Sequence, residues 1–399
     1  MSATTSVQTR DASESAEAPE AVRAAWIATT DEFERLREEW TELFAAAETE
    51  SVFLSFEWMF TWWKHWGKGR RLAIVAVRDG RGRLVGLAPL STARSRPSGM
   101  RRLSFLADDH VGSDYLGILA RPEWEEAAVE AIVSALFLRR RDWDYIEFGD
   151  AEDGRLLAGL CARLEAGGMT ARKTHASTCH HIELPSSFDT YLAEVGIKLR
   201  SNYRRRWRVI ERTGPAEFIA ISDPGGLEQH FPELLRLHRN RFEQRERESA
   251  FVMPGVPEFH EEALRELAAR GWPRLFLLRV SGQTVAALYG FSMGRKFQFY
   301  QCGMDPEWMK LSVGQLLVGA SIEEAIRTGH TDFDFLRGDE SYKAQWAEQR
   351  RQTVTVRLFD GRPASLAARA AYVAAGVLRQ VKRRIKAARA KARTEVPEN

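Results

Sequence analysis

The chain has 399 residues, of which 44% are hydrophobic and 28% charged, with a net charge of only +3, as in ordinary soluble proteins with room for two domains of about 150 residues each. No apolar run approaches the ~20 residues of a membrane span and the N-terminal stretch has no hydrophobic signal core, so we expect neither an integral membrane protein nor a secretory leader. Three scattered cysteines exclude a disulfide framework and a zinc site, so we expect a cytoplasmic protein.

The first domain is predicted over residues 23–184, after a leader at residues 1–22 whose Ala, Ser, Thr and Glu content predicts disorder. It begins with a short strand and a helix that Asp31 is expected to cap, and an aromatic-rich helix follows at residues 56–66. Its further predicted elements are strands at residues 72–77, 84–90, 103–106, 145–148 and 171–184 and a helix at residues 122–137.

Residues 185–270 are predicted to be a helical connection that also begins the second domain. Within it, residues 198–212 hold seven Lys or Arg against one acid, in a segment expected to be helical up to Gly214. Such a charge excess predicts a surface that faces an anionic partner. The other predicted helices cover residues 188–195, 226–247 and 258–270.

The core of the second domain is predicted over residues 271–360, around a βαβ unit. A strand of alternating apolar and polar residues ends near Gln301, a helix with a broad apolar stripe covers residues 316–326, and a second strand runs through residues 333–335. The crossover in such a unit has an almost fixed hand, and its helix begins at the carboxyl end of the first strand.

Two stretches of the first half have counterparts in the second half. Residues 71–90 parallel residues 274–291, and residues 143–150 parallel residues 332–339. Copies separated by so much sequence indicate a duplicated domain rather than a solenoid. The alternation of strands and helices, with strand pairs joined by short turns, predicts a mixed α/β fold with partly antiparallel sheets.

The segment before the βαβ helix carries Lys310, Ser312 and Gly314. Small residues let a ligand approach the backbone, and the unpaired N–H groups of a helix N-terminus attract anions, so this position suits a phosphate. The alternative is an ordinary helix start that Ser312 caps.

The residues Met309, Lys310, Leu311, Ser312, Val313 and Gly314 align with the pyrophosphate loop of GNAT acyltransferases, which reads Gln/Arg-x-x-Gly-x-Gly/Ala, and Gly314 keeps its last position. The stretch FDFLRGDESYKAQW more specifically resembles the CelD/BcsL-type acetyltransferases of exopolysaccharide and cellulose production, a branch related to FemAB-like transferases. The resemblance covers roughly residues 25–360. It implies tandem GNAT-like domains and a donor, acetyl-coenzyme A or another acyl-coenzyme A, held by Lys310, Ser312, Val313, Gly314 and Gln315.

Acyl transfer needs an activated nucleophile and a proton for the departing thiolate. Tyr342 follows the second strand of the βαβ unit, where GNAT enzymes commonly carry a tyrosine that acts as general acid, although a structural tyrosine fits the same position. Asp334 is a candidate general base or substrate contact, and the alternative is a solvated strand residue.

The predicted substrate contacts gather at the edge where ligands of α/β proteins bind. Arg337, Asp339 and Lys343 follow the last strand of the βαβ unit, and Asp114 with Tyr115 occupies a turn of the first domain. His238 lies on a predicted helix and is either packed or part of the acceptor pocket. The nine histidines show no metal-ligand spacing, so we expect no metal.

The resemblance implies transfer of an acyl group to an amine or hydroxyl of a small-molecule or lipid-linked sugar in envelope or exopolysaccharide synthesis. One alternative is a FemAB-like transferase that takes an aminoacyl group from tRNA, whose phosphates the basic segment 198–212 would bind. Another is a non-catalytic accessory protein of a polysaccharide synthase.

Residues 361–399 are predicted to form a basic helix and tail beyond the second domain. The apolar part, with Leu366, Ala370, Val373 and Val377 at helical spacing, is expected to dock on the second domain. Residues 382–393 hold seven cations and no acid, and they either form a solvated tail or lie on the anionic inner face of a membrane.

Overall fold

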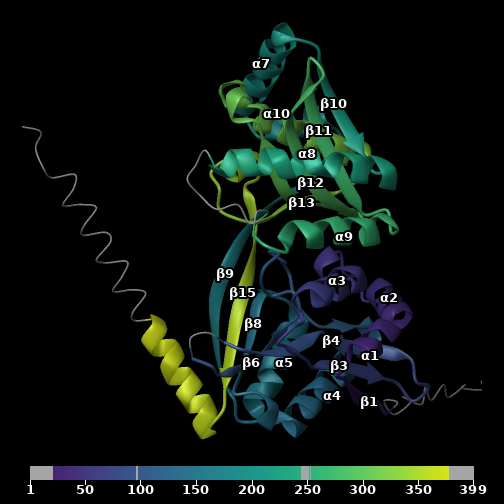
Figure 1. Ribbon diagram of the computed structural model, residues 1–399, viewed down its shortest axis with the longest axis vertical. Helices are drawn as coiled ribbons and strands as arrows, with labels where there is room; N and C mark the ends of the chain where they lie inside the picture. Colours follow the sequence, from purple (N-terminus) through teal and green to yellow (C-terminus); the bar gives the residue numbers. More distant parts are fainter. Residues whose placement is uncertain (1–20, 96–97, 244–250, 252, 377–399) are drawn as a thin grey trace, which may run out of the picture.

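The computed structural model shows the predicted mixed α/β fold, arranged as two stacked lobes that follow the two halves of the sequence (Figure 1). The predicted leader lies outside the described residues, except for its last two positions. The described residues are 21–95, 98–243, 251 and 253–376.

The first half alternates strands and helices much as predicted. Thr29, not Asp31, caps its first helix, because Thr29 and Glu32 form a reciprocal capping box. The elements are β1 (Arg23–Ile27), α1 (Thr30–Arg35), α2 (Arg37–Ala46), η1 (Val52–Leu54), α3 (Phe56–Trp66), β2 (Arg71–Leu72), β3 (Ile74–Arg78), β4 (Leu84–Ala88), β5 (Leu90–Arg94), β6 (Arg101–Phe105), β7 (Leu119–Ala120), η2 (Pro122–Trp124), α4 (Glu125–Leu138), η3 (Arg140–Asp142), β8 (Tyr145–Glu152), α5 (Arg155–Ala166) and β9 (Thr170–Glu183).

The second half contains the predicted βαβ unit. Its first strand runs to Met304 rather than to Gln301, because the additional residues continue to pair with the preceding strand, and a short 3₁₀ helix replaces the predicted loop. The elements are α6 (Phe188–Glu194), α7 (Ile197–Thr213), β10 (Ala216–Ile221), α8 (Pro224–Glu243), α9 (Val256–Ala268), β11 (Pro273–Val280), β12 (Gln283–Met293), β13 (Lys296–Met304), η5 (Pro306–Leu311), α10 (Val313–Arg327), β14 (Asp332–Arg337), α11 (Lys343–Trp346) and β15 (Gln349–Phe359).

The two halves repeat one strand pattern and exchange their last strands. Strands β1, β3 and β4 pair antiparallel, as do β10, β11 and β12, and each half then has one parallel pair, β6 with β8 and β13 with β14. The exchanged strands lie next to these parallel pairs. Strand β15 of the second half pairs with β8 of the first, and β9 of the first half pairs with β14 of the second. Strands β9 and β15 also pair with each other along their length (Figure 1). Each half therefore completes the sheet of the other.

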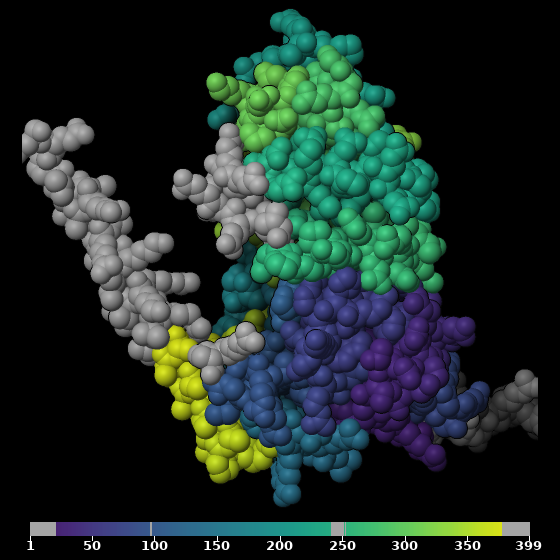
Figure 2. Space-filling model, viewed as in Figure 1, coloured from purple at the N-terminus to yellow at the C-terminus, as the bar shows by residue number. Residues whose placement is uncertain are grey.

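The purple-to-blue surface of the first half and the green surface of the second half meet over a broad contact (Figure 2). A buried aromatic cluster joins the two halves there. Trp58 of α3 is fully buried and contacts the rings of Phe259 on α9, Phe291 on β12 and Tyr300 on β13. Its Nε1 donates to Ser113 Oγ at 2.9 Å. The indole therefore buries its apolar surface and still makes the one hydrogen bond that its N–H can donate.

The prediction that the C-terminal helix docks on the second domain is wrong. Residues 363–376 form a helix beside the far ends of β9 and β15, next to the first half (Figure 1). The helix is held there because the Tyr372 ring lies under the guanidinium groups of Arg357 and Arg172, at 4.4 and 5.5 Å. Leu366 and Val373, predicted to be its docked face, are 49% and 46% exposed. Val377 and the basic residues 382–393 lie outside the described residues.

Among the described residues, no helix combines the length and the apolar character that crossing a bilayer requires.

Candidate active site

Strands β13 and β14 diverge toward their carboxyl ends. They pair in parallel only from Lys296 with Asp332 to Gln298 with Asp334, a last pair that we call the vertex. Beyond it β13 remains paired with β12, whereas β14 kinks and returns to β9. The kink places Leu336 at φ 54°, a strained conformation for a leucine, and a hydrogen bond of 2.8 Å from its N–H to Asp334 Oδ1 stabilises it.

In the first half, the corresponding strands β6 and β8 also diverge, but a backbone segment around Leu116 lies next to β8. Strands β6 and β8 pair in parallel from Arg102 to Ser104, and then Leu116 forms a parallel bridge to Ala151. The Leu116 N–H donates to the Asp150 carbonyl, and the Glu152 N–H donates to the Leu116 carbonyl. No described residue forms such a backbone bridge between β13 and β14, where the contacts come from side chains instead. The Arg337 N–H donates to Asp114 Oδ2 at 3.0 Å, and the Tyr300 hydroxyl donates to the Val111 carbonyl. Within this part of the chain, the divergence without a backbone bridge is therefore the one in the second half.

The N-terminus of α10 lies at the open end of this divergence. Ser312 occupies the N-cap position at φ 59°, and its side chain makes no capping bond, unlike the predicted cap. The side chain of Lys310 is exposed, while that of Val313 is buried in the core. Gly314 packs close to Met304: a Cβ added at this glycine would overlap the Met304 methyl group. The N–H groups of Gln315 and Leu316 donate to the Ser312 carbonyl. No serine side chain competes for the N–H groups of Val313 and Gly314, which leaves these two for an anion.

Tyr342 lies at the same end of the sheet, at the start of α11. Its side chain is half-buried and packs on the apolar cluster that α10 also covers. The neighbouring Trp346 donates from Nε1 to Gln315 Oε1 at 2.6 Å, which ties α11 to the first turn of α10. The structure therefore places α11, which Tyr342 precedes, against the first turn of α10, and it gives Gln315 a structural partner.

Asp334 is fully buried rather than on a solvated strand face. Its Oδ2 accepts hydrogen bonds from the Tyr115 hydroxyl at 2.8 Å and from Arg351 Nη1 at 3.2 Å. Burial raises the pKa of Tyr115 far above its usual value, with the Asp334 charge acting in the same direction, so the phenol stays protonated and donates. With the Leu336 N–H as a third donor, this geometry favours a structural role for Asp334 over that of general base.

The predicted anion contacts Arg337 and Lys343 are committed to internal partners. Arg337 Nε donates to Asp114 Oδ1 at 2.6 Å, and its Nη1 lies 3.2 Å from Asp150. Burial raises the pKa of Asp114 to about 6, against the opposing charge of Arg337. Lys343 is buried and donates to the Arg337 carbonyl at 2.6 Å. The interpretation of these two cations as substrate ligands needs correction, because buried charges require such partners.

The remaining predicted substrate contacts, Asp339, His238 and Tyr115, lie in different surroundings. Asp339 is 78% exposed, and its Oδ1 lies 3.3 Å from His180 Nε2. His238 is buried on α8, with its Nε2 3.2 Å from Gln301 Oε1. Of the residues predicted to bind the acceptor, Tyr115 lines a cavity between the two halves.

Arg351 and His260 are residues of this region that the sequence did not indicate. Arg351 on β15 forms ion pairs with Asp334 and with Asp332, at 3.2 and 2.5 Å. His260 is buried beside Tyr300, and burial lowers its pKa to about 3, so its ring is neutral at physiological pH. Neither position lies in a motif, and both reach these partners through the packing of elements that are distant in the sequence.

Comparisons with known proteins identify the type of fold. Residues 198–344 match the family model described as an acetyltransferase (GNAT) domain. The chain has a GNAT-type fold. A structure of FemX superposes over 84% of this chain and 96% of its own, with a TM-score of 0.55 at 12% identity. A search of curated protein sequences gave no significant match.

Two further structures share the GNAT-type fold across both halves. The C-terminal domain of a putative lysylphosphatidylglycerol synthetase from Agrobacterium fabrum gives a TM-score of 0.52 at 11% identity, covering 86% of this chain and 97% of that one. L-PGS from Bacillus licheniformis gives 0.52 at 13% identity, covering 86% and 96%. At such low identity, these similarities establish the fold alone.

Among the described residues, no group of three or more His, Cys, Asp or Glu is arranged to hold a metal ion.

Proposed function

We propose that this protein is an acyltransferase that moves an acetyl or other acyl group from acyl-coenzyme A to an amine or hydroxyl of a sugar-type acceptor in envelope or exopolysaccharide synthesis. The observation that carries the proposal is the open divergence of β13 and β14, with the uncapped N-terminus of α10 at its open end. The sugar acceptor and the pathway rest on the resemblance to the CelD/BcsL-type enzymes.

The divergence provides a site for an extended thioester donor. Its pyrophosphate would bind the N–H groups of Val313 and Gly314, where the helix dipole and the free donors favour an anion. The acyl carbonyl would then lie toward the vertex. Attack by the acceptor forms the new bond as the C–S bond breaks, and Tyr342 gives a proton to the departing thiolate.

We expect Gly314→Val to weaken acetyl-coenzyme A binding, because the added side chain crowds the first turn of α10. Loss of one charge-assisted hydrogen bond to the pyrophosphate corresponds to about 1.5–3 kcal/mol. Calorimetric titration of the intact chain with acetyl-coenzyme A measures the effect.

The added side chain also displaces Met304, so a second variant separates the two causes. Gly314→Val/Met304→Ala gives the valine room inside the protein. If the double variant regains full affinity, the loss came from Met304, and the α10 N-terminus is not the pyrophosphate site. If the affinity stays low, the proposal stands.

The second candidate donor is an aminoacyl-tRNA, and α7 is the observation that favours it. This basic helix packs beside η5 and α10, and its cationic side chains are exposed or half-exposed. Arg204 pairs with Asp189 at 2.8 Å, at the protein surface. A cationic helix of 17 residues presents more positive surface than one coenzyme needs, and it suits a nucleic-acid backbone.

Titrations with the two donors decide between these candidates. Tight binding of acetyl-coenzyme A that is little affected by Arg205→Glu/Arg208→Glu supports the first. Salt-sensitive binding of aminoacyl-tRNA that the same variant abolishes supports the second. Binding of neither donor would identify the third possibility, a non-catalytic accessory protein.

We also propose peripheral attachment of this cytoplasmic protein to the inner face of a membrane through its C-terminal segment. Leu366 and Val373 expose an apolar helix face, and residues 382–393 add seven cations, each contributing roughly 1 kcal/mol near anionic lipid. The intact chain should co-sediment with anionic vesicles at low salt, and truncation after Gln380 should abolish this. Equal pelleting of the two proteins, or equal pelleting with neutral phosphatidylcholine vesicles, would exclude the electrostatic anchor.

A further inference from the structure

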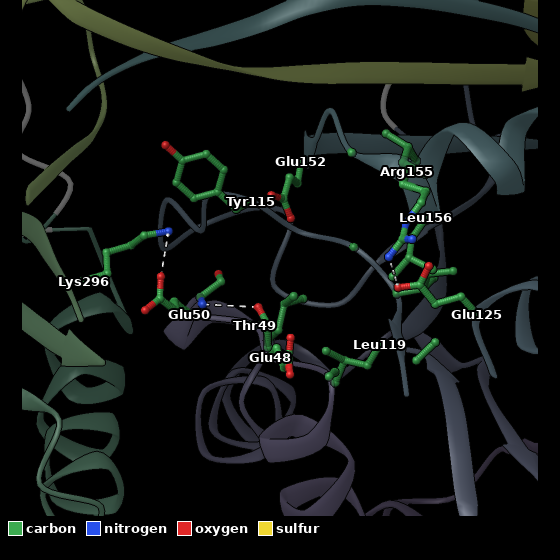
Figure 3. Close-up of a pocket in the computed structure, with 18 of the residues that line it drawn as sticks. Glu48, Thr49, Glu50, Tyr115, Leu119, Glu125, Glu152, Arg155, Leu156 and Lys296 are labelled. Atoms are coloured by element: carbon green, nitrogen blue, oxygen red, sulfur yellow. Dashed lines mark hydrogen bonds and ion pairs between the residues drawn. The ribbon is translucent and has the colours of Figure 1, made fainter. Parts of the chain in front are cut away.

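A cavity of about 430 Å³ lies between the two halves, on the side of the vertex away from α10 (Figure 3). The second half contributes Lys296 and Asp332, the first residues of β13 and β14, together with Gln298. The first half contributes Glu48 to Ser51, the segment around Tyr115, and the start of α5. The cavity therefore begins where the strands begin, whereas the proposed donor site lies where they end.

The cavity wall reaches the vertex itself. Gln298 belongs to the last pair of β13 and β14, and Tyr115 and Arg351, which also line the cavity, both contact Asp334, its partner in that pair. Another lining residue, Lys296, is two positions from Gln298, or about 7 Å along the strand. A ligand in the cavity thus lies close to the point where the acyl group of a donor would arrive.

The side chains that line the cavity include five carboxylates and three cations, an excess of two negative charges. Three cationic side chains are each paired with a carboxylate: Lys296 with Glu50 at 3.6 Å, Arg155 with Glu125 at 2.7 Å, and Arg351 with Asp332 at 2.5 Å. Two lining carboxylates remain, Glu48 and Glu152, and no ion pair involving them is found among the described residues. Figure 3 shows the carboxylate of Glu152 directed into the space between Tyr115 and the Arg155–Glu125 pair.

Two buried polar atoms in the cavity wall also lack partners among the described residues. Gln298 is 0% exposed, and its Nε2 makes no hydrogen bond, while its Oε1 accepts from the Val52 N–H at 3.4 Å. Asp332 Oδ1, on the adjacent strand, is likewise buried and without a hydrogen bond. Native proteins rarely leave such groups unsatisfied, and each costs about 1–3 kcal/mol, so a polar ligand that satisfies them gains affinity here.

From these observations we infer that the cavity binds the acceptor, and that the acceptor carries a primary ammonium group. The ammonium lies among the carboxylates of Glu48, Glu152 and Asp332, and a hydroxyl or carbonyl of the ligand accepts from Gln298. Anionic acceptors are disfavoured by the same charges. The inference rests on the proposed acyl transfer and narrows its acceptor from an amine or a hydroxyl to an amine.

The reaction balances with such an acceptor. The bound ammonium releases one proton to solvent through the open cavity and becomes a nucleophilic amine. Its nitrogen forms a bond to the acyl carbon as the C–S bond breaks, and it loses a second proton as the thiolate gains one. The products are an amide, a free thiol and one released proton.

Matched pairs of small molecules test the binding step without any donor. We expect 1,5-diaminopentane and glucosamine to bind the intact chain in calorimetric titrations, and 1,5-pentanediol and glucose, which lack the ammonium, to bind at least about tenfold more weakly. The Glu48→Gln/Glu152→Gln variant should bind the amines about tenfold more weakly, as expected for the loss of two partly exposed ion contacts. Its affinity for the alcohols should be unchanged. Glu126→Gln, an exposed acid on α4 that does not line the cavity, is the control and should bind like the original protein.

The outcomes separate this inference from the donor assignment. Equal binding of amines and alcohols, or full amine affinity in the double variant, overturns the inference even if acetyl-coenzyme A binds. Selective amine binding without acetyl-coenzyme A binding supports the ammonium site and overturns the donor. An unchanged melting temperature of the double variant excludes a general loss of folding.

Discussion

Replacement of Tyr342 by phenylalanine is expected to lower kcat for acetyl transfer by about 10²- to 10⁴-fold, while the affinity for acetyl-coenzyme A stays nearly unchanged. A general acid acts on the departing thiolate, which exists only as the bond breaks, so its loss affects turnover rather than binding. The position of Tyr342 at the start of α11 is consistent with this role, because the Trp346–Gln315 hydrogen bond holds α11 against the first turn of α10.

The measurement needs both kinetics and stability. Steady-state rates give kcat and KM, calorimetric titration gives the donor affinity, and thermal unfolding reports on the packing of the half-buried ring. Tyr342→Phe retains the ring, so packing should be preserved. A parallel fall in affinity and turnover, or a lower melting temperature with normal kcat, would assign Tyr342 a structural role.

Trp58→Ala is expected to destabilise the whole chain by about 3–5 kcal/mol, the range for removal of a large buried aromatic side chain. Trp58 is fully buried and contacts residues from α9, β12 and β13, so it joins elements of both halves. The substitution leaves a cavity at the junction and removes the donor that Ser113 accepts.

Urea unfolding followed by both far-UV circular dichroism and fluorescence measures this loss. We expect the two signals to change together, because β9 and β15 tie each half to the other. Trp58→Phe, which keeps an aromatic ring without the indole N–H, should lose less than half as much stability. Two separate transitions, with one half unaffected, would contradict the assignment of Trp58 to a shared core.

The local periodicity of the sequence determined the secondary structure around the site. Apolar residues alternate over 297–301 and recur at helical spacing over 316–326, and these patterns depend on short-range geometry that residue order alone fixes. For the same reason, the parallel between residues 71–90 and 274–291 indicated the repeated strand pattern. The βαβ unit, and the position of the proposed donor loop at the start of α10, follow from this local periodicity.

The tertiary structure decided which polar residues are free to act. Asp334, Arg337 and Lys343 look accessible in the sequence, but their partners Arg351, Asp114 and the Arg337 carbonyl come from other strands or loops. The exchange of β9 and β15 between the halves is equally invisible locally, because strand pairing depends on hydrogen bonds between distant segments. The cavity and its excess of carboxylates arise from that contact: its walls come from both halves, and no single segment of the sequence carries the charge pattern.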